Sequence, residues 1–408
     1  MIGAGAAGLA AADALARKGR RVLVLEARDR VGGRCWTRRV PGIHAPIELG
    51  AEFIHGEAKA THALLRQARI PAVASVREQR WLDRGRLRPI DAFVEAQRAT
   101  RDASLDEDVS FSHFLSTLKI PDKTRTFATL MVQGFDAADP KRVSARSIVE
   151  EWGEAGSLVA SQPRPRGGYA ALMDWLAARA VRRGARLHLG AHVREVRWRR
   201  GAVLVSGTFA GRPFAVRGRQ AVSTLPLGVL QAADVRFLPA LKNTEALEKL
   251  ASGPVIRVAM GFRDAFWRKR SPGVAFFHVP DAPFPTFWTP LPMGARLLTA
   301  WAGGPKAERL AGLGNAELFE AASMSVESVF GRKTRNQLTF AMAQDWHADR
   351  FSRGGYSYVR VGGEGAREAL ARPIADTLYF AGEATDKEEA GTVAGALRSG
   401  QRAARELL

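Results

Sequence analysis

The spacing of apolar residues along the chain alternates between helix-like and strand-like. An alanine-rich stretch follows the first glycines and ends near Arg17, Lys18 and Gly19, a common way for a helix to end. Residues 21–25 then form a short apolar run that is typical of a buried parallel strand, and this run closes with Glu26. The N-terminal pattern therefore predicts a glycine turn, a helix and a strand, in that order.

The rest of the chain also reads as a mixture of helices and strands. Amphipathic spacing predicts a long helix over residues 170–183. The other predicted elements are strands within residues 186–222, 250–267, 296–302 and 377–381, a largely helical stretch over 306–330, and a final helix through residue 408. We find no internal repeat and no low-complexity linker, so the domains are expected to be interleaved along the sequence.

The opening glycines carry the first chemical signal. Gly3 permits a tight turn, Gly5 lets the backbone approach a pyrophosphate, and Gly8 allows a helix and a strand to pack closely. Glu26 stands 23 positions after Gly3, at the end of the predicted strand, where it would accept hydrogen bonds from a ribose. In this context the glycines predict a dinucleotide-binding unit.

This fingerprint normally follows a strand, and here only Met1 and Ile2 precede the first glycine. We therefore expect the first strand to be truncated because the chain starts late. Any signal peptide would then lie upstream of the sequence.

Composition excludes several classes of protein. The chain has 408 residues, of which 46% are hydrophobic and 25% charged, as in a globular protein with room for two domains. No uninterrupted apolar run reaches the roughly 18 residues of a membrane-spanning helix. The single cysteine, Cys35, excludes an internal disulfide and a cysteine-based zinc site, and the histidines show no metal-ligand spacing, so no metal is expected.

The charge is strongly positive, with 61 Lys and Arg against 41 Asp and Glu, a net charge of +20 and a pI near 11.0. The basic residues are scattered, and only short clusters such as residues 197–200 occur. We therefore expect no specific nucleic-acid partner, only weak attraction to polyanions or anionic lipid surfaces.

Three further segments are rich in glycine and charge. Residues 30–34 place two glycines between arginines, which suits a loop around a diphosphate. Residues 48–56 form a glycine-bearing loop with little surface character. Residues 380–385 end a strand in Gly382 and Glu383, and a helix begins near Gly391 with free amides.

With these segments in place, the sequence resembles the flavin-containing amine oxidases, which include monoamine oxidases, polyamine oxidases and histone lysine demethylases of that fold. The resemblance spans essentially the whole chain, and includes residues 221–230, 266–267 and 346–358. It implies an α/β fold: a Rossmann-like FAD-binding domain interleaved with an α+β substrate domain. The expected FAD domain gathers residues 1–57, 167–228 and 345–408, and the substrate domain residues 58–166 and 229–344.

The family pattern implies FAD lying extended across the first domain. The residues that match its binding positions are Gly3, Gly5, Gly8, Glu26, Arg28, Gly33 and Arg34 at the adenosine and diphosphate end, Val193 at the adenine, Gly50, Ala51, Glu52 and Phe53 at the isoalloxazine, and Gly382, Glu383, Thr392 and Val393 around the ribityl chain and pyrimidine. Gly355 matches the position of a covalent flavin link in some members, so FAD is expected to be bound non-covalently.

The resemblance also implies the reaction and its residues. A hydride equivalent passes from the C–H beside an amine nitrogen to flavin N5, in a dry pocket and without a protein nucleophile. Arg257 stands where the family usually has a lysine linked to oxygen reactivity, so fast reaction with oxygen is in doubt. Tyr356 matches one of two aromatic residues that flank the amine, the second position is Thr392, and Trp346 is expected to contact the flavin.

Some residues near these motifs have plainer interpretations. Trp267 is expected in the core, Cys35 as a small buried side chain, and His55 in structural hydrogen bonding. Arg164 and Arg166 either belong to a solvated turn or face the cofactor cleft. Glu151 and Glu154 are expected to be surface charges of a helix.

The sequence therefore predicts a cytoplasmic FAD-dependent oxidoreductase that acts on a small amine or amino-acid-like substrate, with oxygen or another electron acceptor. One alternative is a flavin dehydrogenase or desaturase acting on a non-amine substrate. Another is a degenerate flavin-binding protein without activity. The positive net charge disfavours polycationic polyamines and favours substrates with a carboxylate, although local charge can override it. The oligomeric state is not predicted.

Overall fold

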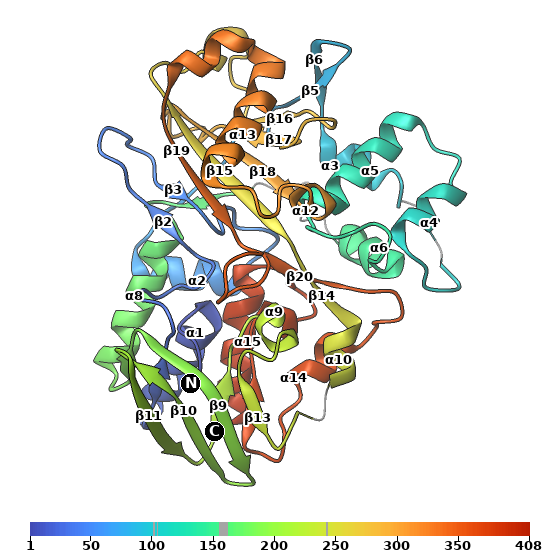
Figure 1. Ribbon diagram of the computed structural model, residues 1–408. Coiled ribbons are helices and arrows are strands. Elements are labelled where there is room, and N and C mark those ends of the chain that lie inside the picture. The colour runs from blue at the N-terminus through green and yellow to red at the C-terminus, as the bar shows by residue number, and fades with distance from the viewer. Residues whose placement is uncertain (101–102, 104, 155–161, 242–243) are drawn as a thin grey trace.

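The chain folds into two parts that meet at a waist, each built on its own sheets (Figure 1). The computed structural model describes residues 1–100, 103, 105–154, 162–241 and 244–408. Both α1 (Ala6–Arg17) and the last helix, α15 (Val393–Glu406), belong to the lower part in Figure 1. The architecture is mixed α/β, as predicted.

Parallel pairs of short strands form the centre of the lower part. β1 (Leu23–Leu25) pairs with β8 (Arg186–His188), and β12 (Ala221–Ser223) pairs with β21 (Leu378–Phe380). Ile2 forms parallel bridges to both Leu25 and Ser223, so residue 2 lies between the two pairs. The first residues thus occupy the central strand position and lead directly into the glycine turn.

Helices α1, α15 and α8 (Tyr169–Arg182) pack together beside these strands. Small residues permit the close approach: a Cβ at Gly400 of α15 would lie 2.1 Å from the carbonyl oxygen of Ala7 in α1. Leucines of all three helices share one buried cluster. The helix predicted over residues 170–183 is thereby confirmed within one residue.

A separate sheet covers the bottom of the molecule in Figure 1. Its order is β11 (Arg212–Gly218), β10 (Ala202–Phe209), β9 (Ala191–Arg199), β13 (Arg236–Leu238). The start of β9 adjoins the end of β1, since the Ala191 amide donates to the Glu26 carbonyl over 2.8 Å. This contact brings β9 to the dinucleotide-binding turn.

The upper part is built on a larger, mainly antiparallel sheet. Within the described residues, its strands follow the order β19 (Leu338–Asp345), β15 (Val255–Phe262), β18 (Leu297–Gly303), β17 (Thr286–Trp288), β16 (Phe276–His278), β5 (Gln79–Asp83) and β6 (Arg86–Ile90). Every residue of β15 is buried, and its alternate side chains Ile256, Val258, Met260 and Phe262 join the cluster that packs against α13 (Asn315–Phe330). The strands expected within residues 250–267 and 296–302 are confirmed.

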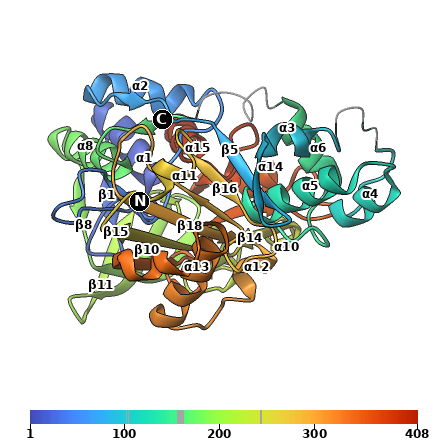
Figure 2. The same ribbon diagram turned by 90° about the horizontal axis from the view of Figure 1, so that it is seen from above.

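Helices of the N-terminal half form a group at one side of this sheet, as Figure 2 shows from above. They are α3 (Ala92–Gln97), α4 (Phe111–Thr117), α5 (Asp122–Gly134) and α6 (Ala145–Glu154), and they share a core around Phe111, Phe127 and Trp152. α2 (Lys59–Ala68) lies apart from them, beside α8.

Short elements complete the described fold and link its two parts. The strands are β2 (Thr37–Arg38), β3 (Ile47–Glu48), β4 (Ala72–Val73), β7 (Arg164–Pro165), β14 (Leu250–Gly253) and β20 (Tyr356–Val359); the helices are α9 (Leu227–Gln231), α10 (Thr244–Lys249), α11 (Trp267–Arg270), α12 (Pro305–Glu308) and α14 (Ala366–Ala371). β14 and β20 pair with each other at the waist. The domain boundaries given above remain a prediction.

Candidate functional site

A large cavity runs between the two parts of the molecule. Its volume is about 1040 Å³, at the upper end of the roughly 300–1,000 Å³ that small-molecule and cofactor sites occupy. Segments distant in sequence line it: the N-terminal glycine turn, the loops near residues 32–35 and 50–57, β9, β20 and residues 382–393. A cavity of this size has room for a dinucleotide together with a small substrate.

The structure brings nearly all the predicted site residues to this cavity. Those that line it are Gly3, Gly5, Glu26, Arg28, Gly33, Arg34, Gly50, Ala51, Glu52, Phe53, Val193, Arg257, Trp346, Tyr356, Gly382, Glu383, Thr392 and Val393. Gly8 lies behind the turn instead, where a Cβ would come within 2.1 Å of the Gly3 carbonyl oxygen. Gly8 therefore serves the packing of α1 against the turn.

The glycine turn presents an open, electropositive helix end. Gly3 has a φ of +100°, which favours glycine, whereas a Cβ added at Gly5 would meet nothing within 4 Å. No side chain caps the N-terminus of α1, and its first turn contains no acidic residue. Free amides and open space at a helix N-terminus form a suitable site for an anion such as a diphosphate.

Glu26 is fixed beside this turn. Its carboxylate accepts hydrogen bonds from the backbone amides of Ala4 (2.7 Å) and Arg28 (2.8 Å). A carboxylate has about four lone-pair sites, so two backbone bonds leave capacity for a ribose hydroxyl. The residues present at this end of the cavity thus fit the adenosine half of a dinucleotide.

Arg28 and Arg34 are each held by a carboxylate at the cavity wall. Arg28 forms a bidentate pair with Asp349, at 2.6 and 3.0 Å, and Arg34 donates to Glu383 over 3.0 Å and to the carbonyl oxygen of Gly355. Burial would raise the pKa of Glu383, but Arg34 and other neighbours lower it below its usual value. Both arginines are therefore positioned, and partly neutralised, without a ligand.

The loop at residues 50–53 packs tightly against its neighbours. A Cβ at Gly50 would lie 1.7 Å from the carbonyl oxygen of Arg34, so the position requires glycine. Trp346, at the end of β19, donates through Nε1 to the carbonyl oxygen of Leu49 over 2.8 Å. The loop is thus fixed between residue 34 and an indole, and cannot accept larger residues at its first position.

Beneath this loop lies a buried ion-pair network that the sequence did not reveal. Arg257 of β15 donates to the carbonyl oxygen of Gly50 (2.8 Å) and forms an ion pair with Glu52. Arg164 of β7 binds the other oxygen of Glu52 through Nε, at 2.7 Å. The indole of Trp288 also donates to Glu52, at 3.1 Å. Three donors from separate strands thus converge on one carboxylate.

The positive charges around Glu52 determine the pKa of its carboxylate. Burial alone would raise the pKa of Glu52, but the charges and hydrogen bonds of Arg257 and Arg164 lower it below its ordinary value. Arg257 is itself almost fully buried, at 2% exposure, and its Nε has no hydrogen-bond partner among the described residues. Arg164 is buried on Glu52 and belongs neither to a solvated turn nor to the residues that line the cavity, whereas Arg166 is exposed.

Aromatic side chains form the wall opposite the glycine turn. Tyr356 stacks on Trp301 with ring centroids 6.5 Å apart and an interplanar angle of 15°, and Trp301 lies 5.9 Å from Trp288. Phe53 lies 5.8 Å from Trp288 and joins the loop to this wall. Such faces suit an apolar or cationic group of a small ligand.

The hydroxyl of Tyr356 is fixed, and a neighbouring histidine is neutral. Tyr356 donates to the carbonyl oxygen of Phe135 over 2.6 Å, and burial raises its pKa well above the usual value, so it stays a phenol. Burial lowers the pKa of His55 to about 4, and its Nδ1 has no partner among the described residues. The structural hydrogen bonding expected for His55 is therefore not seen at Nδ1.

The C-terminal segment supplies a second helix N-terminus. Thr392 caps α15 by accepting from the Gly395 amide over 3.0 Å, and Val393 is the first residue of the helix. Gly382 has a φ of +141°, and a Cβ added there would meet nothing within 4 Å. These residues leave open space beside the helix start, which fits the ring edge of a bound cofactor.

The structure also tests the plainer interpretations given to a tryptophan, a cysteine and two glutamates. Trp267 is a core residue packed on Phe262 and Phe266, away from the cavity. Cys35 is buried, and burial raises its pKa to about 12, so it is a thiol. Glu151 is an exposed residue of α6, as expected, and it also borders the cavity; the side chain of Glu154 lies outside the described part of the chain.

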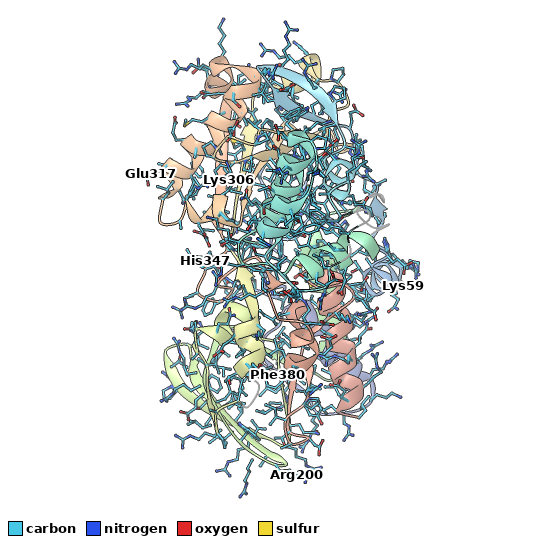
Figure 3. All side chains as sticks on the ribbon, turned by 90° about the vertical axis from the view of Figure 1, so that its right-hand side faces the viewer. Lys59, Arg200, Lys306, Glu317, His347 and Phe380 are labelled. Carbon is cyan, nitrogen blue, oxygen red and sulfur yellow. The ribbon has the colours of Figure 1, made fainter. Side chains whose placement is uncertain are left out.

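Basic residues are distributed over the molecule. Figure 3 shows Lys59, Lys306 and Arg200 at well separated places, and Arg200 pairs with Asp376 at the surface, over 3.1 Å. Among the described residues, no helix is long and apolar enough to cross a membrane. No group of three or more His, Cys, Asp or Glu side chains in these same residues could hold a metal ion.

Comparison with known proteins gives a consistent match. The family model for flavin containing amine oxidoreductase matches residues 6–408. Lysine-specific histone demethylase 1 homolog 1 of Arabidopsis thaliana is 28% identical over 442 residues, which cover all of this chain and 52% of the relative. Human lysine-specific histone demethylase 2 is 26% identical, over all of this chain and 53% of that protein. The chain thus spans about half the length of the curated relatives it matches.

Solved structures show the same fold. Putrescine oxidase bound to putrescine has a TM-score of 0.84 at 23% identity, covering all of this chain and 97% of the other. Cyclohexylamine oxidase from Brevibacterium oxydans IH-35A has a TM-score of 0.83 at 22% identity, with the same coverage. At this level of identity the likeness establishes the shared fold.

Proposed function

Because this chain belongs to the flavin-containing amine oxidoreductases, we propose that it oxidises the C–N bond of a small amine with non-covalently bound FAD. The observation that carries this proposal is the continuity of the cavity from the open helix end at Gly5 to the aromatic wall at Tyr356. A cofactor that extends along the cavity from the helix end would bring its reactive end to the aromatic wall. The chain itself then needs to bind, orient and desolvate the amine.

The residues present fit FAD. Gly5 and the start of α1 would hold the diphosphate, Glu26 the ribose, and the loop at residues 50–53 the isoalloxazine. Gly355 offers no side chain for a covalent link. A flavin bound there would supply, at N5, the acceptor for a hydride equivalent from the C–H beside the amine nitrogen, and water would hydrolyse the resulting imine.

The aromatic wall provides what this reaction needs from the protein. Transfer requires the neutral amine, and an apolar cavity lowers the pKa of a bound ammonium by desolvation. The stacked rings of Tyr356 and Trp301 are held by hydrogen bonds from both side chains to the segment at residues 134–135. A fixed wall limits the orientations of the amine and keeps its C–H close to the acceptor.

We further propose that the reduced flavin reacts slowly with oxygen and prefers another acceptor. Arg257 stands where the family usually has a lysine, and its guanidinium is engaged by Glu52 and by the carbonyl oxygen of Gly50. A guanidinium is planar and bulkier than an ammonium, so it is less able to keep a single water molecule in place against flavin N5. The buried carboxylate also offsets its positive charge.

The proposal is tested by anaerobic mixing of the purified flavoprotein with butylamine, benzylamine and butanol. Amines should bleach the visible flavin absorbance, whereas butanol should not. Bleaching by non-amine compounds alone would favour a dehydrogenase or desaturase of another class. A protein that retains no flavin after reconstitution would fit a degenerate flavin-binding protein and contradict the proposal.

A further inference from the structure

The sheet at the bottom of Figure 1 lies in the most basic segment of the molecule that its function does not use. Its strands β11, β10, β9 and β13 all fall within residues 186–238. This segment holds nine arginines against two acidic residues, Glu195 and Asp234, so it carries about a third of the net charge of +20 in about an eighth of the chain. The short basic cluster at residues 197–200 is therefore part of a larger basic surface.

The strand register shows which side chains share one face of this sheet. Arg197 of β9 lies opposite Leu238 of β13 on one side and opposite Leu204 of β10 on the other. Leu204 in turn lies opposite Arg217 of β11. Residues directly opposite each other in neighbouring strands point to the same face. These four residues therefore form one row across the sheet, in which arginine and leucine alternate.

This row faces outward, because the neighbouring row faces the core. The residues one position away in each strand belong to a hydrophobic cluster on the inner face; they are Val196, Val205, Val216 and Phe237. Successive side chains of a strand point to opposite faces, so the row of arginines and leucines lies on the outer face. Arg197 and Arg217 are exposed there, and Leu238 is 41% exposed. None of the four residues lines the cavity between the two parts.

The acidic side chain on the outer face offsets only part of this charge. Glu195 pairs with Arg197 at 2.6 Å and with Arg236 at 2.8 Å, and the two arginine side chains remain 63% and 72% exposed. Ion pairs with such exposed arginines contribute little in water, so another anion can compete for them. Arg199 and Arg217 add two further exposed charges. The outer face thus keeps a positive charge that a partner can reach.

The leucines in the row favour a lipid surface over a nucleic acid. An apolar side chain between basic ones can enter the boundary between the headgroups and the acyl chains of a bilayer, while the arginines stay at the headgroups. The phosphate backbone of a nucleic acid attracts the arginines equally but offers the leucines no apolar contact. The row also crosses four strands, so its charges meet a broad surface together rather than a single groove.

We propose that the outer face of this sheet, centred on Arg197, Leu204, Arg217 and Leu238, binds the surface of an anionic lipid bilayer. The arginines pair with lipid phosphate and carboxylate groups, and the leucines enter the interface. Charges elsewhere on the protein are screened beyond roughly 8–10 Å at physiological salt, so this face determines how the protein sits on the bilayer. The inference concerns a second surface and does not depend on the proposed oxidation of an amine.

Co-sedimentation of the flavin-loaded protein with lipid vesicles tests the proposal. The vesicles contain phosphatidylcholine with about one-third phosphatidylserine, in about 0.1 M salt. We expect the protein to bind these vesicles and to leave them in about 0.5 M salt, because anionic headgroups supply most of the attraction and salt screens it. Vesicles of phosphatidylcholine alone should bind far less protein.

A pair of double variants locates the binding surface. Arg197→Gln with Arg217→Gln removes two charges from the row and should weaken vesicle binding by at least about tenfold. Arg332→Gln with Lys333→Gln removes the same charge from exposed positions just after α13, in the other part of the molecule, and should change binding by less than about twofold. The visible spectrum of the bound flavin should stay the same in both, which shows that both proteins remain folded.

Leu238→Ser distinguishes a lipid surface from a nucleic acid. It should weaken vesicle binding severalfold, since the apolar contact is lost, and leave the binding of a DNA duplex of about 20 base pairs unchanged. Equal binding to both kinds of vesicle, or equal loss in the two double variants, would overturn the proposal. Vesicle binding that Leu238→Ser leaves unchanged, together with DNA binding that Arg197→Gln and Arg217→Gln abolish, would also overturn it and assign the face to nucleic acid.

Discussion

Arg257 and Glu52 form a buried ion pair directly below the loop that is expected to face the flavin. Arg257 comes from the fully buried strand β15, and Glu52 from the loop that follows β3. The side chains are 2% and 9% exposed. Because each partner touches the same short loop, the pair links the main sheet of the upper part to the wall of the cofactor cavity.

Arg257→Lys should raise the rate at which oxygen reoxidises the reduced flavin. A lysine ammonium is compact and can hold one water, whereas the guanidinium directs its donors to Gly50 and Glu52. Anaerobic reduction by amine should change little. Stopped-flow measurement of both half-reactions decides the matter, with Arg263→Lys, an exposed change just beyond β15, as the control. A wild-type reoxidation rate equal to or above that of the lysine variant would refute the assigned role.

Glu52→Ala should destabilise the protein strongly. The change leaves Arg257 and Arg164 buried without their shared carboxylate, and removing one partner of a buried pair costs about 3–5 kcal/mol. Urea unfolding of the flavin-free protein measures the loss directly. Glu57→Ala, five residues along the same loop at a fully exposed site, should have little effect. Similar stabilities for the two variants would contradict the network.

Gly5→Ala should separate cofactor binding from folding. The added Cβ meets no protein atom within 4 Å, so the melting temperature of the flavin-free protein should stay close to that of the wild type. The methyl group would occupy the space assigned to the diphosphate, so FAD affinity should fall by at least about tenfold, or 1.4 kcal/mol. Gly153→Ala, an equally open position in α6, is the matched control. Unchanged FAD affinity in Gly5→Ala would argue against this placement.

Stability should depend on pH through Glu48, which accepts from the Tyr169 amide at the start of α8 (2.7 Å). Burial raises the pKa of Glu48 from 4.5 to about 7. The folded state then holds a proton that the unfolded state loses, so this stabilisation is present below about pH 4.5 and is lost as the pH rises through 7. The pKa values of His55 and His278 are lowered to about 4, which acts in the opposite direction.

The Glu48 effect is therefore measured as a difference. Glu48→Gln removes the titration, so the free energy of unfolding of the wild type relative to this variant should fall by a few kcal/mol between about pH 4.5 and 8. A constant difference across that range would show that Glu48 does not titrate as described.

The fold and the cofactor end of the cavity could be predicted because their signals are local in sequence. Gly3, Gly5 and Glu26 belong to one turn–helix–strand unit, whose backbone geometry restricts the residues allowed. The position of Arg257 followed from the family pattern. Its ion pair with Glu52 could not be predicted, because Glu52 and Arg257 are 205 positions apart and meet only when β15 packs below the loop.

The substrate end was harder to predict because its residues come from helices whose orientation the sequence leaves open. Glu151 lies exposed on the amphipathic helix α6, and only the placement of that helix brings it to the border of the cavity. Asp136 also lines the cavity, but it lies in an irregular segment beyond α5 and carried no motif. One local signal was present in the sequence. Asp136 follows Gly134 and Phe135 at the C-terminal end of a helix, where an acidic residue is unfavourable.

The central claim is that this chain transfers the hydrogen beside an amine nitrogen to bound flavin. It is tested most directly by mixing the flavoprotein anaerobically with benzylamine and with benzylamine deuterated at the carbon next to nitrogen. The account predicts that both bleach the flavin absorbance and that the deuterated amine does so several-fold more slowly, because the C–H bond breaks in this step. Equal rates with the two amines, or no bleaching by any amine of the panel, would contradict it.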